Sequence, residues 1–292
     1  MMVSGGLDGG GAMEDSVVAP VNRGSLRRLL DKVRDDQGLE LHQYRERYLE
    51  RRVGIRLTAL GLQTYHQYAA YLDSYSEEYA ALVDTIAVNV TQFFRDDSFY
   101  ERFRATVIPA VLEHKASRHQ HIIRVWSAGC ATGQEPYSIA MSFMSVFIER
   151  PYEYSLSVYG TDLDIRAIEV ARRATYPLAQ LEHIPYADRC FVEIGSDTFK
   201  IKPEVTRIAH FSCLNLHEEK PIQVLDVIFC RNVFIYFNKD EQKRMLESFW
   251  EALSPGGYLV LGRSERMHPS LNRRFELIDS RERIYRKPLS AF

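Results

Sequence analysis

Two carboxylates, Glu135 and Asp162, follow apolar segments that are expected to be β-strands. The ends of parallel strands are positions where sheets bind ligands. The mostly apolar segment 122–126 runs into residues 127–136, a turn with two glycines that opens a helix. The next apolar segment ends in Gly-Thr-Asp at Asp162. A carboxylate at this point can accept hydrogen bonds from both hydroxyls of a ribose, so Asp162 is the expected ribose ligand. Asp164 is expected to cap the following helix, whose dipole favours a negative charge at its start.

The glycine turn discriminates between classes of nucleotide ligand. No Gly-Lys-Ser/Thr follows it, which argues against a phosphate-binding P-loop, and the full Gly-x-Gly-x-x-Gly of dinucleotide binders is absent. Glu135 lies in the turn and would repel a phosphate. A carboxylate there suits a ligand with an ammonium group and a sulfonium, as in S-adenosyl-L-methionine. The alternative is an ordinary strand-to-helix turn, since many such turns contain two glycines.

Composition limits the class of protein. The chain has 292 residues, of which 46% are hydrophobic and 26% charged, the balance of a soluble protein with a sizeable core. No apolar run approaches the roughly 20 residues that cross a bilayer, and no signal sequence is evident, so we expect a cytoplasmic protein without membrane insertion. The net charge of −2 gives no general affinity for nucleic acid. The four cysteines are expected to be reduced core residues, and the chain to be a monomer.

The hydrophobic pattern divides the chain into three parts. Residues 1–22 contain five glycines and few large apolar side chains, which predicts a flexible tail. Residues 23–90 have apolar positions at helical spacing and predict a small helical domain. Residues 91–292 alternate short strands with amphipathic helices after about residue 120, which predicts an α/β domain with a doubly wound parallel sheet. Residues 176–211 are expected to form a small antiparallel β-subdomain inserted in it. Its expected strands are residues 191–194, 198–202 and 205–211.

Several motifs in order resemble the chemotaxis receptor methyltransferase (CheR) family. They are Asn89-Val90-Thr91-Gln92-Phe93-Phe94-Arg95, residues 127–138, Thr161-Asp162-Leu163-Asp164, residues 230–237, Gly256-Gly257-Tyr258-Leu259 and Gly262-Arg263-Ser264-Glu265. The likeness covers nearly the whole chain beyond the tail. It implies a class I methyltransferase domain that uses S-adenosyl-L-methionine and releases S-adenosyl-L-homocysteine. The implied partner is the cytoplasmic helical bundle of methyl-accepting chemotaxis receptors, whose glutamates become methyl esters.

The resemblance also implies roles for single residues. Those implied to line the cofactor site are Asn89, Thr91, Arg95, Glu135, Asp162, Asn215, Leu216, Arg231 and Asn232. Arg95 and Tyr236 are implied to face the reacting methyl group. From the sequence alone, Asn232 would be a turn residue after a strand. Arg231 directly follows an apolar strand, so its burial would be costly without a charged partner.

Methyl transfer from a sulfonium to a carboxylate needs alignment more than a base. A glutamate side chain, with a reference pKa of about 4.3, is already ionised at neutral pH. The sequence offers no convincing Ser-His-Asp, Cys-His or metal-ligand cluster, and no metal is expected. Orientation alone can supply roughly 7–11 kcal/mol. We hypothesise that Arg95 and Tyr236 aim the incoming carboxylate more than they bind it.

Residues 23–60 are basic in a chain that is acidic overall. They carry ten Lys and Arg against six Asp and Glu, a surplus of four. Most charged helix faces are merely solvated, which is the alternative to a docking role. In the CheR family the helical domain is thought to dock on the glutamate-rich receptor bundle, and Arg51, Arg52 and Arg56 are the predicted substrate-binding residues. Some family members also hold a receptor peptide at the β-subdomain, but the short turn at 195–197 argues against this here.

Two other functions are compatible with parts of the sequence. One is a methyltransferase for nucleic acids or small molecules, which would carry Asn/Asp-Pro-Pro-Tyr after the fourth strand, where Arg231-Asn232-Val233 stands instead. The other is a signalling adaptor that binds the cofactor without catalysis. Such an adaptor would have lost Arg95, Glu135, Asp162 or Tyr236, and all four are present.

Overall fold

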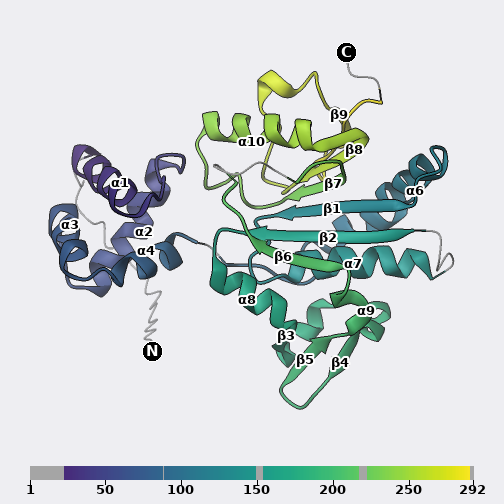
Figure 1. The fold of residues 1–292 in the computed structure, drawn as a ribbon, viewed down its shortest axis with the longest axis horizontal. Helices are drawn as coiled ribbons and strands as arrows, with labels where there is room; N and C mark the ends of the chain where they lie inside the picture. Colours follow the sequence, from purple (N-terminus) through teal and green to yellow (C-terminus); the bar gives the residue numbers. More distant parts are fainter. Residues whose placement is uncertain (1–22, 88, 149–153, 217–221, 290–292) are drawn as a thin grey trace, which may run out of the picture.

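The computed structural model describes residues 23–87, 89–148, 154–216 and 222–289. Figure 1 shows a group of helices beside a larger α/β body, joined to it by an extended segment. This arrangement confirms the predicted fold class, a helical part followed by an α/β part. The tail predicted for residues 1–22 lies outside the described residues.

Four helices within residues 23–87 pack around one core because their apolar side chains recur at helical spacing. They are α1 (Arg23–Gln37), α2 (Glu46–Ala59), α3 (Tyr65–Ser74) and α4 (Glu78–Ile86). Val33 and Tyr68 are fully buried in this core. The Thr64 side chain accepts a hydrogen bond from the Gln67 backbone at the start of α3, and Gln67 reciprocates, which forms a capping box.

Seven strands of the described chain form the main sheet, in the order β6-β2-β1-β7-β8-β10-β9. They are β1 (Ile122–Ala128), β2 (Ser155–Asp162), β6 (Ala209–Cys213), β7 (Leu225–Cys230), β8 (Leu253–Leu261), β9 (Glu276–Asp279) and β10 (Ile284–Arg286). The first five in this order are parallel, and β10 is antiparallel to both of its neighbours. Every residue of β7 is buried, as expected for a parallel strand covered on both faces.

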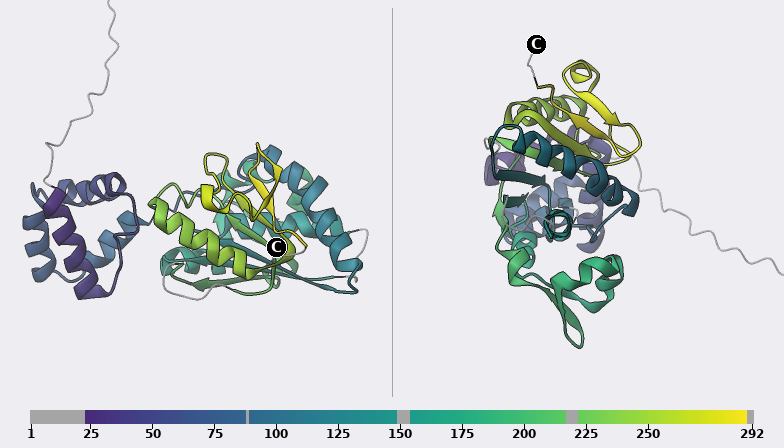
Figure 2. Two further views of the ribbon diagram at one scale, coloured as in Figure 1. Left: turned by 90° about the horizontal axis from the view of Figure 1, so that it is seen from above. Right: turned by 90° about the vertical axis from the view of Figure 1, so that its right-hand side faces the viewer.

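Helices cover both faces of the sheet (Figure 2). Consecutive β1 residues Val125 and Trp126 point into two different cores, one with Phe103 and Phe143 and the other with Phe249. The helices of the α/β part include α5 (Asp97–Arg102), the π-helical η1 (Phe103–Val107), α6 (Ile108–Ala116), α7 (Gln134–Phe147), α8 (Ile165–Arg173), α10 (Lys239–Ala252) and the short η4 (Pro269–Leu271). The strand order reverses at β1, where β2 lies on one side and β7 on the other. A crevice for ligands is expected at the carboxyl ends of these strands.

The inserted β-subdomain is present, but its third strand differs from the prediction. It contains β3 (Thr175–Pro177), β4 (Val192–Ile194) and β5 (Thr198–Ile201), antiparallel in the order β3-β5-β4. The short helices around it are η2 (Leu178–His183), η3 (Tyr186–Phe191) and α9 (Pro203–Thr206). The assignment of residues 205–211 to this subdomain was wrong, because β6 pairs in parallel with β2 in the main sheet. The apolar pattern of a short strand does not reveal which sheet it joins.

The cysteines only partly follow the prediction. Cys130 and Cys230 are buried, whereas Cys190 and Cys213 are exposed, so the expectation that all four are core residues was wrong. Cys213 ends β6, the strand at one edge of the main sheet, where fewer neighbours cover it. Among the described residues, none of the four cysteines forms a disulfide. Among the helices of the described chain, none has the length and apolar character to cross a membrane.

Candidate active site

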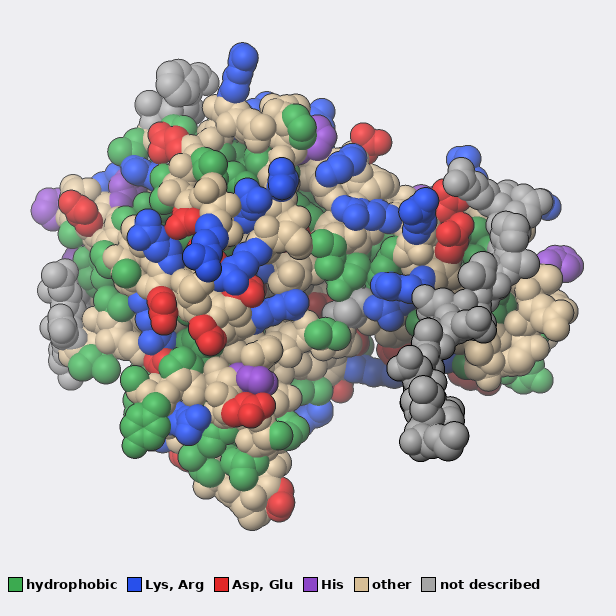
Figure 3. All heavy atoms as spheres, turned by 180° about the vertical axis from the view of Figure 1, so that it is seen from behind, with side chains coloured by type: hydrophobic (Ala, Val, Ile, Leu, Met, Phe, Trp, Pro, Cys, Tyr) green, Lys and Arg blue, Asp and Glu red, His purple; other side chains and the backbone are tan. Residues whose placement is uncertain are grey.

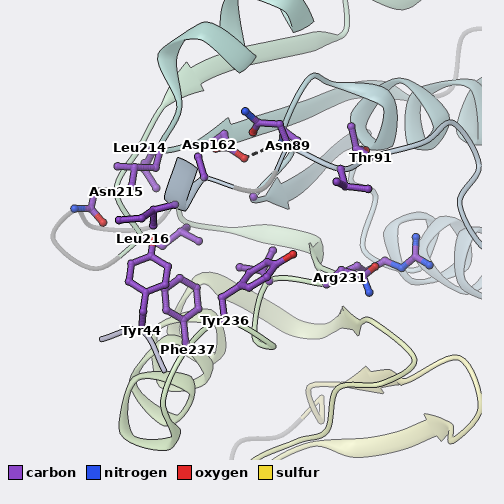
Figure 4. Close-up of a pocket in the computed structure, with 18 of the residues that line it drawn as sticks. Tyr44, Asn89, Thr91, Asp162, Leu214, Asn215, Leu216, Arg231, Tyr236 and Phe237 are labelled. Carbon is purple, nitrogen blue, oxygen red and sulfur yellow. Dashed lines mark hydrogen bonds between the residues drawn. The ribbon is translucent and has the colours of Figure 1, made fainter. Parts of the chain in front are cut away.

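A pocket lies at the carboxyl ends of β1, β2 and β7 and extends to the helical part. It is bordered by all ten residues implied to line the cofactor site or to face the methyl group (Figure 4). They are Asn89, Thr91, Arg95, Glu135, Asp162, Asn215, Leu216, Arg231, Asn232 and Tyr236. These residues come from separate segments, and the switch in strand order brings them together.

Asp162 is held at the end of β2 by backbone groups. Its carboxylate accepts hydrogen bonds from the Ala131 N–H at 2.8 Å and from the Asp164 N–H at 3.0 Å. Burial raises the pKa of Asp162, and these two backbone hydrogen bonds oppose the rise. The Asp164 side chain accepts a hydrogen bond from the Arg166 N–H at 2.8 Å, which confirms its predicted role as a helix cap.

Glu135 lies in the first turn of α7, directly after the glycine turn. Gly133 adopts a φ of 94°, which a residue with a side chain rarely adopts, and an added Cβ would lie 2.7 Å from the Ala171 Cβ. The Glu135 carboxylate accepts a hydrogen bond from the Ser127 hydroxyl at 2.7 Å. Burial raises the pKa of Glu135, and Arg231 opposes the rise. A partly buried carboxylate at a pocket wall favours a cationic ligand.

Arg231 is buried and has charged partners, as its position after an apolar strand required. Its side chain is only 2% exposed. Its guanidinium lies 2.6 Å from an Asp96 carboxylate oxygen and 3.5 Å from a Glu135 oxygen. It also stacks over the Phe99 ring, with 4.4 Å from Cζ to the ring centre. In Figure 4 the guanidinium points away from Asp162 and Tyr236, so Arg231 supports the pocket wall from behind.

The segment that leads from the helical part into the α/β part supplies Asn89, Thr91 and Arg95. The Asn89 amide donates a hydrogen bond of 2.6 Å to the Asp164 carboxylate, which ties the start of this segment to α8. Farther along, Phe94 is buried and its backbone N–H donates to the Ser138 hydroxyl at 2.9 Å. The segment is therefore fixed at both ends, with Arg95 at the pocket.

The loop after β7 supplies Asn232 and Tyr236. Asn232 has a φ of 61°, which agrees with the expected turn, and its N–H donates to the buried Glu265 carboxylate at 3.0 Å. The Gly262 N–H donates to the same carboxylate at 2.6 Å. Glu265, from the last motif of the sequence, thus shapes the loop that carries Tyr236. Burial raises the pKa of Tyr236, so its hydroxyl stays protonated at neutral pH.

The helical part closes one side of the pocket, which the sequence did not predict. The Tyr44 ring lies 4.7 Å from that of Phe237, and the two residues form an antiparallel bridge. The Arg45 N–H donates to the Tyr236 carbonyl at 2.8 Å, and the Tyr48 ring lies 4.9 Å from the Tyr236 ring. Tyr44 shares helical spacing with Tyr48, which indicates a core position and does not reveal a contact with the other part of the chain. Phe237 is in the motif at 230–237, but no site role followed from that.

Family profiles match both parts of the chain. Residues 89–284 match the CheR methyltransferase, SAM binding domain, and residues 25–87 match the CheR methyltransferase, all-alpha domain. The chain belongs to the CheR methyltransferase family. This confirms the resemblance inferred from the motifs. The change from one matched region to the other falls between α4 and the segment that begins at Asn89.

Individual CheR relatives are similar over most of their length. The chemotaxis protein methyltransferase of Borreliella burgdorferi is 28% identical over 258 residues, which are 86% of this chain and 91% of that protein. The chemotaxis protein methyltransferase of Salmonella typhimurium is 32% identical over 262 residues, 86% of either chain.

Within the described residues, no group of three or more His, Cys, Asp or Glu side chains is arranged to hold a metal ion.

The three arginines predicted to bind substrate in this CheR chain have different environments on α2. Arg51 is exposed. Arg52 lies over the Tyr48 ring, with 5.3 Å from its Cζ to the ring centre. Arg56 forms two hydrogen bonds, of 2.7 and 2.8 Å, with the two carboxylate oxygens of Glu78 on α4. Arg56 therefore connects two helices of its own domain, and its substrate-binding role stays a prediction.

Proposed function

We propose that this protein is a protein-glutamate O-methyltransferase that modifies chemotaxis receptors. Its pocket would bind S-adenosyl-L-methionine, and the acceptors would be glutamate carboxylates on the cytoplasmic helical bundle of the receptor. The products would be glutamyl methyl esters and S-adenosyl-L-homocysteine. The observation that carries the proposal is the convergence of two partly buried carboxylates, Glu135 and Asp162, with Arg95 and Tyr236 around one pocket.

The chemistry of the pocket fits the cofactor. Asp162 can accept hydrogen bonds from ribose hydroxyls, and Glu135 can pair with the ammonium group. Apolar side chains of Leu214, Tyr44 and Phe237 on the pocket wall suit the adenine ring. When bound, the cofactor supplies an electrophilic methyl group on a sulfonium. Asn89, Thr91, Asn215, Leu216, Arg231 and Asn232 would complete the cofactor site.

Arg95 and Tyr236 would orient the acceptor. The acceptor carboxylate is ionised at neutral pH, so no residue needs to remove a proton. The protonated Tyr236 hydroxyl and the Arg95 guanidinium can donate hydrogen bonds to one carboxylate oxygen while the other attacks the methyl carbon. The bound cofactor would supply the methyl group, and its sulfur would keep the electron pair of the broken carbon–sulfur bond in S-adenosyl-L-homocysteine. The contribution of these two residues is alignment.

The basic surface of α2 would bring the acceptor to this point. Arg52 lies over the ring of Tyr48, and that ring lies 4.9 Å from the ring of Tyr236, which borders the pocket. Arg51 precedes Arg52 on α2 and is exposed. Figure 3 shows Lys and Arg side chains over both the α/β part and the helical part, although the chain is acidic overall. Such a surface attracts and orients a glutamate-rich helical bundle. We infer that Arg51 and Arg52 contact the acceptor, while Arg56 supports α2 through its pair with Glu78 on α4.

The proposal can be tested with labelled S-adenosyl-L-methionine and membranes that contain chemotaxis receptors. Treatment of the labelled receptors with alkali should release the label as methanol, because carboxyl esters are base-labile. Label that resists alkali, or that appears on nucleic acid or a small molecule, would contradict the proposal. A protein that binds the cofactor and transfers no label would be an adaptor.

A further inference from the structure

Arg231 lies between the carboxylates of Asp96 and Glu135 and is closer to that of Asp96. Its guanidinium is 2.6 Å from the Asp96 carboxylate but 3.5 Å from that of Glu135. The same guanidinium donates a hydrogen bond of 3.1 Å to the Arg95 carbonyl. Since Arg231 is nearly fully buried, water does not replace these partners. Its position is set by the balance between Asp96 and Glu135.

Asp96 is built to hold Arg231. It adopts a left-handed backbone conformation, with a φ of 66°, at the start of α5. Aspartate often caps a helix with its side chain, yet this carboxylate makes no cap hydrogen bond and points to arginines. Its second oxygen lies 3.5 Å from the Arg263 guanidinium, and Arg263 is fixed by hydrogen bonds of 2.9 Å to Glu282. A non-glycine residue in this conformation carries a backbone cost that the arginine contacts offset.

We propose that Asp96 is a positioning residue that draws Arg231 away from Glu135 and so keeps the Glu135 charge available to the ammonium group of the cofactor. This inference rests on the proposed function, in which Glu135 binds that group. Asp96 itself contacts neither cofactor nor acceptor in this scheme. Through the hydrogen bond from Arg231 to the Arg95 carbonyl, the same contact also fixes the backbone of Arg95.

Charge balance gives the reason. A buried arginine requires an anionic partner, since a buried unpaired charge is strongly unfavourable. If Asp96 loses its charge, Glu135 is the one carboxylate within 4 Å of Arg231 among the described residues. Arg231 would then move toward Glu135 and form a close pair. That pair would neutralise Glu135 and compete with a cationic ligand, whereas Asp162 and the apolar wall would be unchanged.

The test compares two ligands by calorimetry on the full-length protein. S-adenosyl-L-homocysteine carries the ammonium group, whereas methylthioadenosine has the same nucleoside and lacks the amino-acid end. In Asp96→Asn we expect the affinity for the first ligand to fall about tenfold, equivalent to about 1.4 kcal/mol, with the affinity for the second unchanged. Asp97→Asn, the same chemical change at the exposed neighbouring residue, should alter neither affinity. Asp96→Glu, which restores the charge, should recover most of the loss.

A second background separates coupling from general damage. In Glu135→Gln, Asp96→Asn should cause no further selective loss, because no carboxylate remains for Arg231 to neutralise. Asp96→Gly, whose backbone accepts a φ of 66°, replaces Asp96→Asn if thermal melting shows that the latter is unfolded. Unchanged affinities, or equal losses for both ligands, would overturn the inference. Failure of the wild-type protein to bind S-adenosyl-L-homocysteine would instead overturn the proposed function, and this inference with it.

Discussion

The pocket and helix α2 show how differently two sets of functional residues depend on the rest of the chain. Residues chosen for the pocket from separate motifs converge on one cavity. The arginines chosen on α2 share a helix yet diverge: Arg51 is exposed, Arg52 covers an aromatic ring and Arg56 is paired with Glu78. The order of the strands brings residues of separate motifs into one pocket. The spacing of arginines on a helix, in contrast, does not show which of them form ion pairs with acidic residues elsewhere in the chain.

The largest expected effect is the loss of Asp162. Asp162→Ala removes the carboxylate proposed to bind the ribose and also frees the Ala131 and Asp164 N–H groups. We expect the affinity for S-adenosyl-L-homocysteine to fall at least about a hundredfold, equivalent to about 2.7 kcal/mol. Calorimetric titration measures the change, with a melting curve as the folding control. A folded variant with wild-type affinity would contradict the proposal that Asp162 binds the cofactor in this pocket.

Arg56 should matter for stability. Arg56→Gln leaves Glu78, whose side chain is 7% exposed, without its cationic partner. We expect the free energy of unfolding of the helical part to fall by about 2 kcal/mol, below the 3–5 kcal/mol seen for fully buried pairs, because Arg56 is partly exposed. Urea unfolding gives this value. Cofactor affinity should stay within twofold, and a stable variant defective only in receptor methylation would show that Arg56 contacts the substrate.

Arg51 and Arg52 should matter for the encounter with the receptor. The double substitution Arg51→Glu and Arg52→Glu reverses two charges near Tyr236. We expect kcat/KM for receptor methylation to fall by about tenfold, and the salt dependence of the rate to weaken. Cofactor affinity, measured in parallel, should be unchanged. If the exposed arginines were merely solvated, the methylation rate would not respond to the charge reversal.

A smaller effect is expected from pH. Burial raises the pKa of Glu135 above its ordinary value of 4.5, and only the ionised form attracts the ammonium group. Affinity for S-adenosyl-L-homocysteine should therefore fall as the pH drops through the raised pKa, by up to about tenfold per pH unit. The stability of the ligand-free protein changes in the opposite direction, since ionising a buried carboxyl costs free energy as the pH rises through that pKa. Glu135→Gln should weaken both dependences and leave the contribution of other groups such as Asp162, whose pKa is also raised by burial. An affinity profile identical to that of the wild type would exclude Glu135 as a titrating group.

Local patterns were sufficient to predict the two-part fold and the residues at the strand ends. The buried run of β7 and the cap at Asp164 carry their signals in a few adjacent residues. Residues 205–211 were misassigned because a short strand does not specify its partner. Tyr44 and the pair of Arg56 with Glu78 were missed because each depends on packing between segments far apart in the sequence. The role proposed for Asp96 could not be inferred from the sequence, because it depends on the distances from Arg231 to Asp96 and Glu135.

Calorimetric titration of the purified wild-type protein with S-adenosyl-L-homocysteine tests the central claim most directly. The account predicts saturable binding at one site per chain, and competition by S-adenosyl-L-methionine for that site. A folded protein that takes up neither compound would contradict it.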